Sequence, residues 1–200
     1  MDGTKLLLLA VVVCLFASPV FASYTCTVKT YQSVPSLHGS DTVLFTRQGG
    51  TNTLDLYDLS YANIEGTSQL KQGAGGIFQL NLFNSSSLDI CGGEVGLLYL
   101  NNNATAVLTG GEIWSIASYQ IVLDNPHIKL YYSGDLPTVQ TISGYDYLTG
   151  TWHNGTSFEI LLLDTGYDVL GNIEFVHNPE PATLFLLGTG GLLLRRKIEN

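Results

Sequence analysis

Gly92-Gly93-Glu94-Val95 is repeated 18 residues later as Gly110-Gly111-Glu112-Ile113, and this repeat is the strongest indication of the fold. The apolar residues around the two copies keep the same offset: Leu88 with Ala106, Ile90 with Leu108, Val95 with Ile113, and Leu98 with Ile116. Short repeats of β-forming residues between Gly-Gly turns are typical of a parallel β-solenoid. A coil of about 18 residues predicts about three short strands, with glycine supplying left-handed backbone angles at the corners.

Stacked coils place equivalent residues directly above one another, about 4.8 Å apart. The aligned apolar residues are therefore predicted to form interior columns, and Asn84 and Asn102 a ladder of side-chain amides. Glu94 and Glu112 would stack as well, and either point into solvent or share a cation such as Ca²⁺. We predict an all-β chain with a short parallel solenoid over residues 23–125. An antiparallel β-sandwich is the alternative, because two good copies could also be paired hairpins.

From Pro126 onward the repeat is lost. The predicted strands there are Ile128–Tyr132, Thr138–Ile142, Phe158–Leu163 and Ile173–Val176. The open end of a solenoid presents unpaired strands that invite aggregation. Residues 126–177 are therefore expected to form a β cap of the same domain.

The N-terminus has the three parts of a secretory signal peptide. Lys5 is followed by the apolar run Leu6–Phe16, and small residues precede a cleavage point between Ala22 and Ser23. We therefore expect residues 1–22 to be a signal helix that directs export and is removed.

The C-terminus combines Pro179-Glu180-Pro181, an apolar run over 182–194 and a basic cluster. A helix over this run would reach only ~20 Å, short of the ~30 Å hydrocarbon core of a bilayer. It could still span the membrane marginally, because the basic side chains can reach the interface and the bilayer can become thinner around the helix. The predicted membrane anchor comprises Ala182, Leu184, Phe185, Leu186, Leu187, Leu192, Leu193, Leu194, Arg195, Arg196 and Lys197.

This tail, over residues 178–200, resembles the PEP-CTERM sorting signal of bacterial exosortase systems. The resemblance implies that the exported protein is held transiently in the inner membrane until an exosortase cleaves near Pro179–Pro181. The resemblance also implies that the processed protein then reaches the cell surface or the extracellular matrix. Because exosortase systems accompany exopolysaccharide, an exopolysaccharide-associated role is expected there. The segment Leu148–Phe158 is similar to the closing region of many repeat-bearing PEP-CTERM proteins.

The chain carries a net charge of −9, and only Lys29, Arg47, Lys71 and Lys129 lie between the two terminal signals. An acidic surface without a basic stripe repels phosphates, so nucleic acid is not an expected partner. Cys26 and Cys91 could form a disulfide outside the cell or remain two unpaired thiols.

Catalytic motifs are weak. The segment Leu161–Gly166 ends in Asp164-Thr165-Gly166 and resembles the catalytic loop of retroviral-type aspartic proteases. Tyr167, however, stands where that family has a small residue. A strand that ends in a turn explains the same residues. The four histidines are scattered, and no metal-binding spacing or phosphate-binding loop is present. We expect neither a metal nor a cofactor.

Sugar binding is the predicted molecular activity, because aromatic rings stack on sugars and acids and amides accept hydroxyl protons. The candidate aromatic residues are Trp114, Tyr119, Tyr131, Tyr132, Tyr145, Tyr147 and Trp152, although most of them could be ordinary core residues. We expect a non-enzymatic, exopolysaccharide-associated surface protein. The alternatives are a carbohydrate-binding module, a pectate-lyase-like enzyme that would need Arg47 or Lys129 beside carboxylates, and an ice-binding protein that would need a flat Thr-rich face.

Overall fold

The computed structural model describes residues 24–46, 48–67, 69–70, 76–119, 127–163, 165–166 and 168–177. Within these ranges the regular elements are strands, apart from the short 3-10 helix η1 (Leu170–Asn172), so the prediction of an all-β chain is confirmed. The predicted signal helix over 1–22 with its cleavage point, and the predicted sorting tail over 178–200, lie outside the described residues. In the described part, no helix is long and apolar enough to cross a bilayer.

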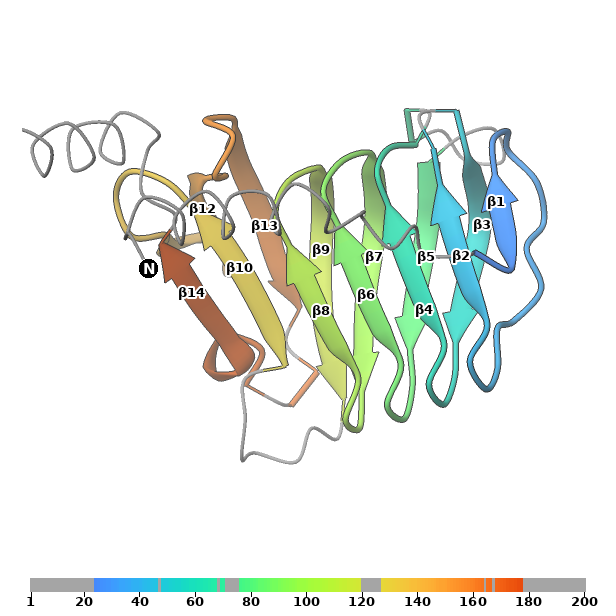
Figure 1. The fold of residues 1–200 in the computed structure, drawn as a ribbon. Helices are drawn as coiled ribbons and strands as arrows, with labels where there is room; N and C mark the ends of the chain where they lie inside the picture. Colours follow the sequence, from blue (N-terminus) through green and yellow to red (C-terminus); the bar gives the residue numbers. More distant parts are fainter. Residues whose placement is uncertain are drawn as a thin grey trace, which may run out of the picture.

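Two seven-stranded sheets, one behind the other in Figure 1, make up the fold. Sheet A consists, in spatial order, of β1 (Cys26–Val28), β2 (Thr42–Phe45), β4 (Tyr61–Ile64), β6 (Ser87–Ile90), β8 (Thr105–Leu108), β10 (Ile128–Tyr132) and β14 (Ile173–His177). Sheet B consists of β11 (Thr138–Ile142), β12 (Tyr145–Thr151), β13 (Ser157–Leu163), β9 (Glu112–Tyr119), β7 (Glu94–Asn101), β5 (Gly76–Leu82) and β3 (Gly50–Leu56).

From β2 to β9 the chain alternates between the sheets, with a short strand in sheet A and a long one in sheet B. Each strand pairs in parallel with its equivalent in the next repeat, which overturns the antiparallel alternative for this region. The expectation of three strands per repeat is also wrong. A single strand of seven or eight residues in sheet B takes the place of two.

The predicted interior columns are confirmed. Register partners are Leu88 with Ala106, Ile90 with Leu108, Val95 with Ile113, and Leu98 with Ile116, and all eight side chains are buried. The inward faces of both sheets contribute to one core. Each leucine or isoleucine that becomes fully buried there stabilises the fold by about 1.5–3 kcal/mol, which explains why the repeat fixes the register.

The predicted amide ladder is also confirmed, and it is longer than expected. Asn102 Nδ2 donates to Asn84 Oδ1 at 3.4 Å, and Asn84 Nδ2 donates to Asp58 Oδ1 at 3.2 Å. All three residues have φ between 57° and 60°, in the left-handed region that Asn and Asp tolerate best after glycine. These side chains therefore both permit the turns that follow β3, β5 and β7 and tie these turns together.

The C-terminal part contains the four predicted strands, with β10 and β11 at the predicted bounds. The sequence did not predict β12, which forms a hairpin with β11 through Ser143 and Gly144, at φ 54° and 83°. Positive φ at both central residues of a two-residue loop is typical of a hairpin whose twist matches its strands. β12 then pairs antiparallel with β13, and β13 pairs in parallel with β9.

The two described cysteines do not form a disulfide with each other. Cys26 and Cys91 are both free thiols. Cys26 lies in β1 and Cys91 directly follows β6, and strands β2 and β4 lie between these two strands. Three steps of about 4.8 Å between strands far exceed the ~7 Å between Cα atoms that a disulfide allows. Burial, together with the neighbouring carboxylates of Glu65 and Asp89, raises the pKa of the Cys91 thiol, which keeps it protonated at neutral pH.

Candidate functional site

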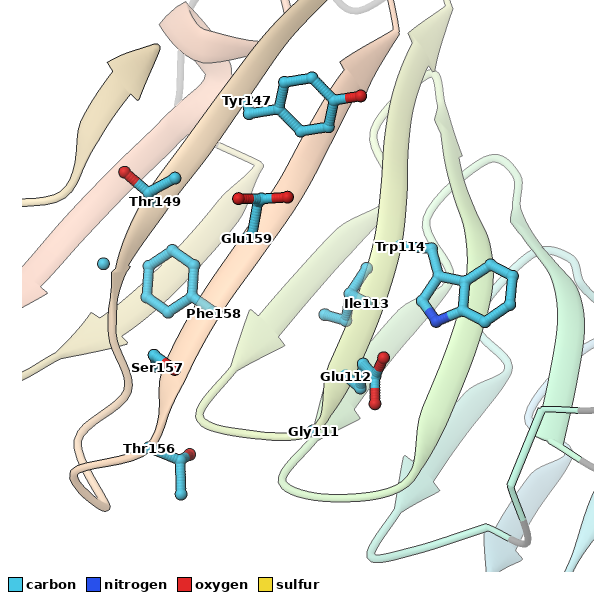
Figure 2. A pocket seen from close by; sticks show the side chains of 11 residues that line it. Gly111, Glu112, Ile113, Trp114, Tyr147, Thr149, Thr156, Ser157, Phe158 and Glu159 are labelled. Atoms are coloured by element: carbon cyan, nitrogen blue, oxygen red, sulfur yellow. The ribbon is translucent and has the colours of Figure 1, made fainter. Parts of the chain in front are cut away.

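A groove of about 770 Å³ opens on sheet B where β9 and β13 separate. The two strands are paired only from Leu161↔Ser115 to Leu163↔Ala117, at the C-terminal end of β13 and in the middle of β9. Their N-terminal ends are not paired, and β12, which lies on the other side of β13, contributes further lining residues. The lining residues are Gly111, Glu112, Ile113, Trp114, Tyr147, Thr149, Gly150, Thr156, Ser157, Phe158 and Glu159 (Figure 2).

Trp152 holds the two sides of the groove together from below. Its side chain is buried, its ring packs on Phe158 at 4.4 Å between centroids, and its Nε1 donates to the Gly111 carbonyl at 2.9 Å. The neighbouring His153 places Nδ1 2.5 Å from the Thr109 carbonyl. The loop between β12 and β13 is thus fastened to the turn between β8 and β9, which fixes the width of the groove.

Aromatic rings line the groove from both sides. Trp114 projects from β9 and remains 49% exposed, while Tyr147 projects from β12 and is half-buried (Figure 2). A tryptophan has more apolar area to bury than any other side chain, and its exposure beside a groove is typical of a binding surface. The pair therefore offers two flat apolar surfaces to a ligand.

Carboxylates and hydroxyls complete the lining. Glu112 lies on β9 and Glu159 on β13, on opposite sides of the groove, and both side chains are accessible to solvent (Figure 2). The hydroxyl of Thr156 donates to Asn154 Oδ1 at 2.7 Å, and that of Thr149 donates to the Thr138 carbonyl at 3.3 Å. Among the described lining residues there is no lysine, arginine or histidine. The groove is therefore acidic, with acceptors on both sides.

The structure brings some of the predicted aromatic residues together and separates others. Trp114 and Tyr147 line the groove, and Trp152 lies beneath it. Tyr131 and Tyr132 belong instead to sheet A, where buried Tyr132 packs edge-on against Phe175 and His177. Tyr145 is exposed at the β11–β12 hairpin, and nothing is described of the Tyr119 side chain.

Glu94 and Glu112, which the sequence predicts to stack, are aligned in the structure, but their side chains have different surroundings. Glu94 and Glu112 are register partners. Glu94 Oε2 accepts a hydrogen bond from the Leu70 backbone, whereas Glu112 faces the groove. Within the described ranges no cluster of three or more His, Cys, Asp and Glu side chains could hold a metal ion.

None of the remaining candidates that the structure describes lines the groove. Lys129 pairs with Glu174 at 3.6 Å in sheet A, and Arg47 lies outside the described residues. Asp164 of the protease-like motif is likewise outside them, while the hydroxyl of Thr165 donates to the Ser118 carbonyl.

Sequence reasoning missed Glu159, Phe158 and the threonines of the lining. The alternation of apolar Phe158, charged Glu159 and apolar Ile160 is present in the sequence. This alternation predicts that Glu159 faces outward, but it does not place Glu159 in the same groove as Trp114.

Comparisons with models of protein families, with curated protein sequences and with solved structures found no match to this chain. The residues of the groove and of the two terminal signals are therefore the basis for assigning a function.

Proposed function

We propose that this chain is an exported, non-enzymatic surface or matrix protein that binds a polysaccharide in the groove between β9, β12 and β13. The observation that carries the proposal is the pairing of exposed Trp114 and half-buried Tyr147 with carboxylates and hydroxyls in one open groove. Sugar rings present apolar faces that stack on aromatic side chains and hydroxyls that donate to carboxylates. An open groove also admits an internal stretch of a long polymer.

The scaffold that we propose for this site is a short parallel β-solenoid closed by a C-terminal β cap. Repeated parallel pairing at a spacing of 18 residues from β6 to β9 supports the solenoid. The antiparallel strands β11 and β12, which lie beyond β13 at the end of sheet B, support the cap. The groove then lies where the repeats meet the cap.

Replacing Trp114 with alanine is expected to weaken glycan binding about tenfold or more, the effect of losing ~1.4 kcal/mol of aromatic stacking. Hexamers of glucosamine, N-acetylglucosamine, glucose and galacturonate are titrated against the protein by calorimetry. Phe78→Ala is the matched control, because Phe78 is 44% exposed on β5 but does not line the groove. If none of the four hexamers binds, or if the two variants weaken binding equally, the proposal is wrong.

We further propose that export and sorting follow the terminal signals, with exosortase as the processing partner and the inner membrane as a transient anchor. The Pro179-Glu180-Pro181 motif, the apolar run and the cations Arg195, Arg196 and Lys197 support this route. Intact-mass measurement of the secreted protein should show a chain that starts at Ser23 and ends near Pro181. A mature C-terminus beyond Arg196 in cells that have the exosortase would contradict it.

A glycoside hydrolase is the second candidate, because Glu112 and Glu159 place two carboxylates in the same groove. Glycoside hydrolysis requires such a pair, one to protonate the leaving oxygen and one to act as base or nucleophile. A pectate-lyase-like mechanism has less support, because Lys129 lies in the other sheet. Release of reducing ends from the same four hexamers identifies a hydrolase, whereas a binding protein leaves them intact.

A further inference from the structure

The charge of the groove points to a narrower ligand class. Its lining holds the carboxylates of Glu112 and Glu159, and none of the described lining residues is cationic. The two lysines that the structure describes lie outside the groove. Lys129 forms an ion pair with Glu174, and Lys29 directly follows β1. A ligand that enters this groove therefore meets negative charge from two strands and no positive charge among the described residues that line it.

We propose that the groove selects polysaccharides built from hexosamines with free amino groups, an inference that rests on the polysaccharide binding proposed above. The protonated amine of each such sugar is a hydrogen-bond donor and a unit positive charge. Because Glu112 and Glu159 lie on opposite sides of the groove, amines on successive or alternate sugars can meet one carboxylate each (Figure 2). Trp114 adds a third attraction, since an ammonium group is drawn to the face of an indole ring.

The same charges disfavour the other common polymers. A uronate chain would bring its own carboxylates beside Glu112 and Glu159, and like charges placed together at an interface oppose binding. An N-acetylated hexosamine keeps the backbone and the apolar ring face but loses the charge. Exposed ion pairs contribute little each, so two of them give a preference of about tenfold for the free amine over its acetylated counterpart.

The test compares glucosamine hexamer, N-acetylglucosamine hexamer and galacturonate hexamer on the full-length protein, in low-salt buffer in which the sugar amines are protonated. We expect the glucosamine hexamer to bind about tenfold more tightly than the acetylated one, and galacturonate to bind weakest. The preference should shrink as salt is raised, because ions screen exposed charges.

Two double variants separate the groove from the acidic surface as a whole. Glu112→Gln with Glu159→Gln should remove the preference for the free amine, so that the free and acetylated hexamers bind this variant with about equal affinity. Glu65→Gln with Asp135→Asn makes the same change in net charge at exposed sites outside the groove, and the preference should survive it.

Each remaining outcome has a definite meaning. Equal binding of the free and acetylated hexamers, tighter binding of galacturonate, or equal losses in the two double variants would overturn the charge selection and leave polysaccharide binding standing. Failure of every hexamer to bind, the glucose hexamer included, would overturn the proposed function itself.

Discussion

Replacing Trp152 with alanine should cost about 4 kcal/mol of folding free energy, the largest loss expected from a single side chain among the described residues. Trp152 is 1% exposed and is the largest fully buried side chain among the described residues. The substitution leaves a large cavity against Phe158 and removes the indole donor from the Gly111 carbonyl, which accepts its hydrogen bond at 2.9 Å. Both effects destabilise the same junction between the repeats and the C-terminal strands.

Urea denaturation followed by circular dichroism measures the effect, and the loss should lower the melting temperature by roughly 10 °C. Trp114→Ala is the control, because it removes the same side chain from a position that is 49% exposed and should change stability by less than about 1 kcal/mol. Trp152→Phe should recover part of the loss, since it refills the cavity without restoring the hydrogen bond. Similar losses at Trp114 and Trp152 would show that the junction does not depend on the buried indole.

Replacing Gly93 with alanine should cost about 3 kcal/mol, because two separate penalties meet at this corner. Gly93 has a φ angle of 84°, which residues with a side chain rarely adopt. A Cβ there would also lie 2.6 Å from the Thr67 backbone nitrogen and 2.8 Å from Thr67 Oγ1. That hydroxyl accepts a hydrogen bond from the Glu94 backbone at 2.7 Å, so moving Thr67 aside disrupts the start of β7.

Two further glycines divide the penalty into its parts. Gly155 has φ of 85°, but an added Cβ there would have no atom within 4 Å, so Gly155→Ala tests backbone strain alone and should cost about 1 kcal/mol. Gly92 has no positive φ, but a Cβ there would lie 2.4 Å from the Glu65 carbonyl oxygen, so Gly92→Ala tests close packing alone. Chemical denaturation of the three variants should rank Gly93 first. A loss at Gly155 equal to that at Gly93 would show that the close approach to Thr67 is unimportant.

The sequence predicted the repeats well because their signals are local and are repeated. The glycines at 92–93 and 110–111 mark the same corner in two copies, and the apolar residues between them keep one offset. Parallel strands in register bury both copies of each apolar position, so the offset translates directly into the pairs Leu98↔Ile116 and Ile90↔Leu108. The amide ladder follows from the same offset.

The parts that the sequence did not predict depend on the arrangement of distant segments. Strand β12 contains Asp146 and Gly150, two residue types that are uncommon in strands, and its hairpin with β11 turns at Ser143-Gly144. The groove exists because β13 rejoins β9 after a long excursion through β10, β11 and β12, and pairs with only part of it. No local pattern could place Glu159 opposite Glu112.

The spacing between repeats has a consequence for how this protein can change. Ala62 and Leu88 are register partners although 26 residues separate them, whereas Leu88 and Ala106 are partners at a separation of 18. The extra residues lie between β4 and β5, and strand pairing resumes beyond them without a shift. Segments of different length can thus be accepted at this corner while the core is kept, so we expect natural variation and engineered insertions to be tolerated there.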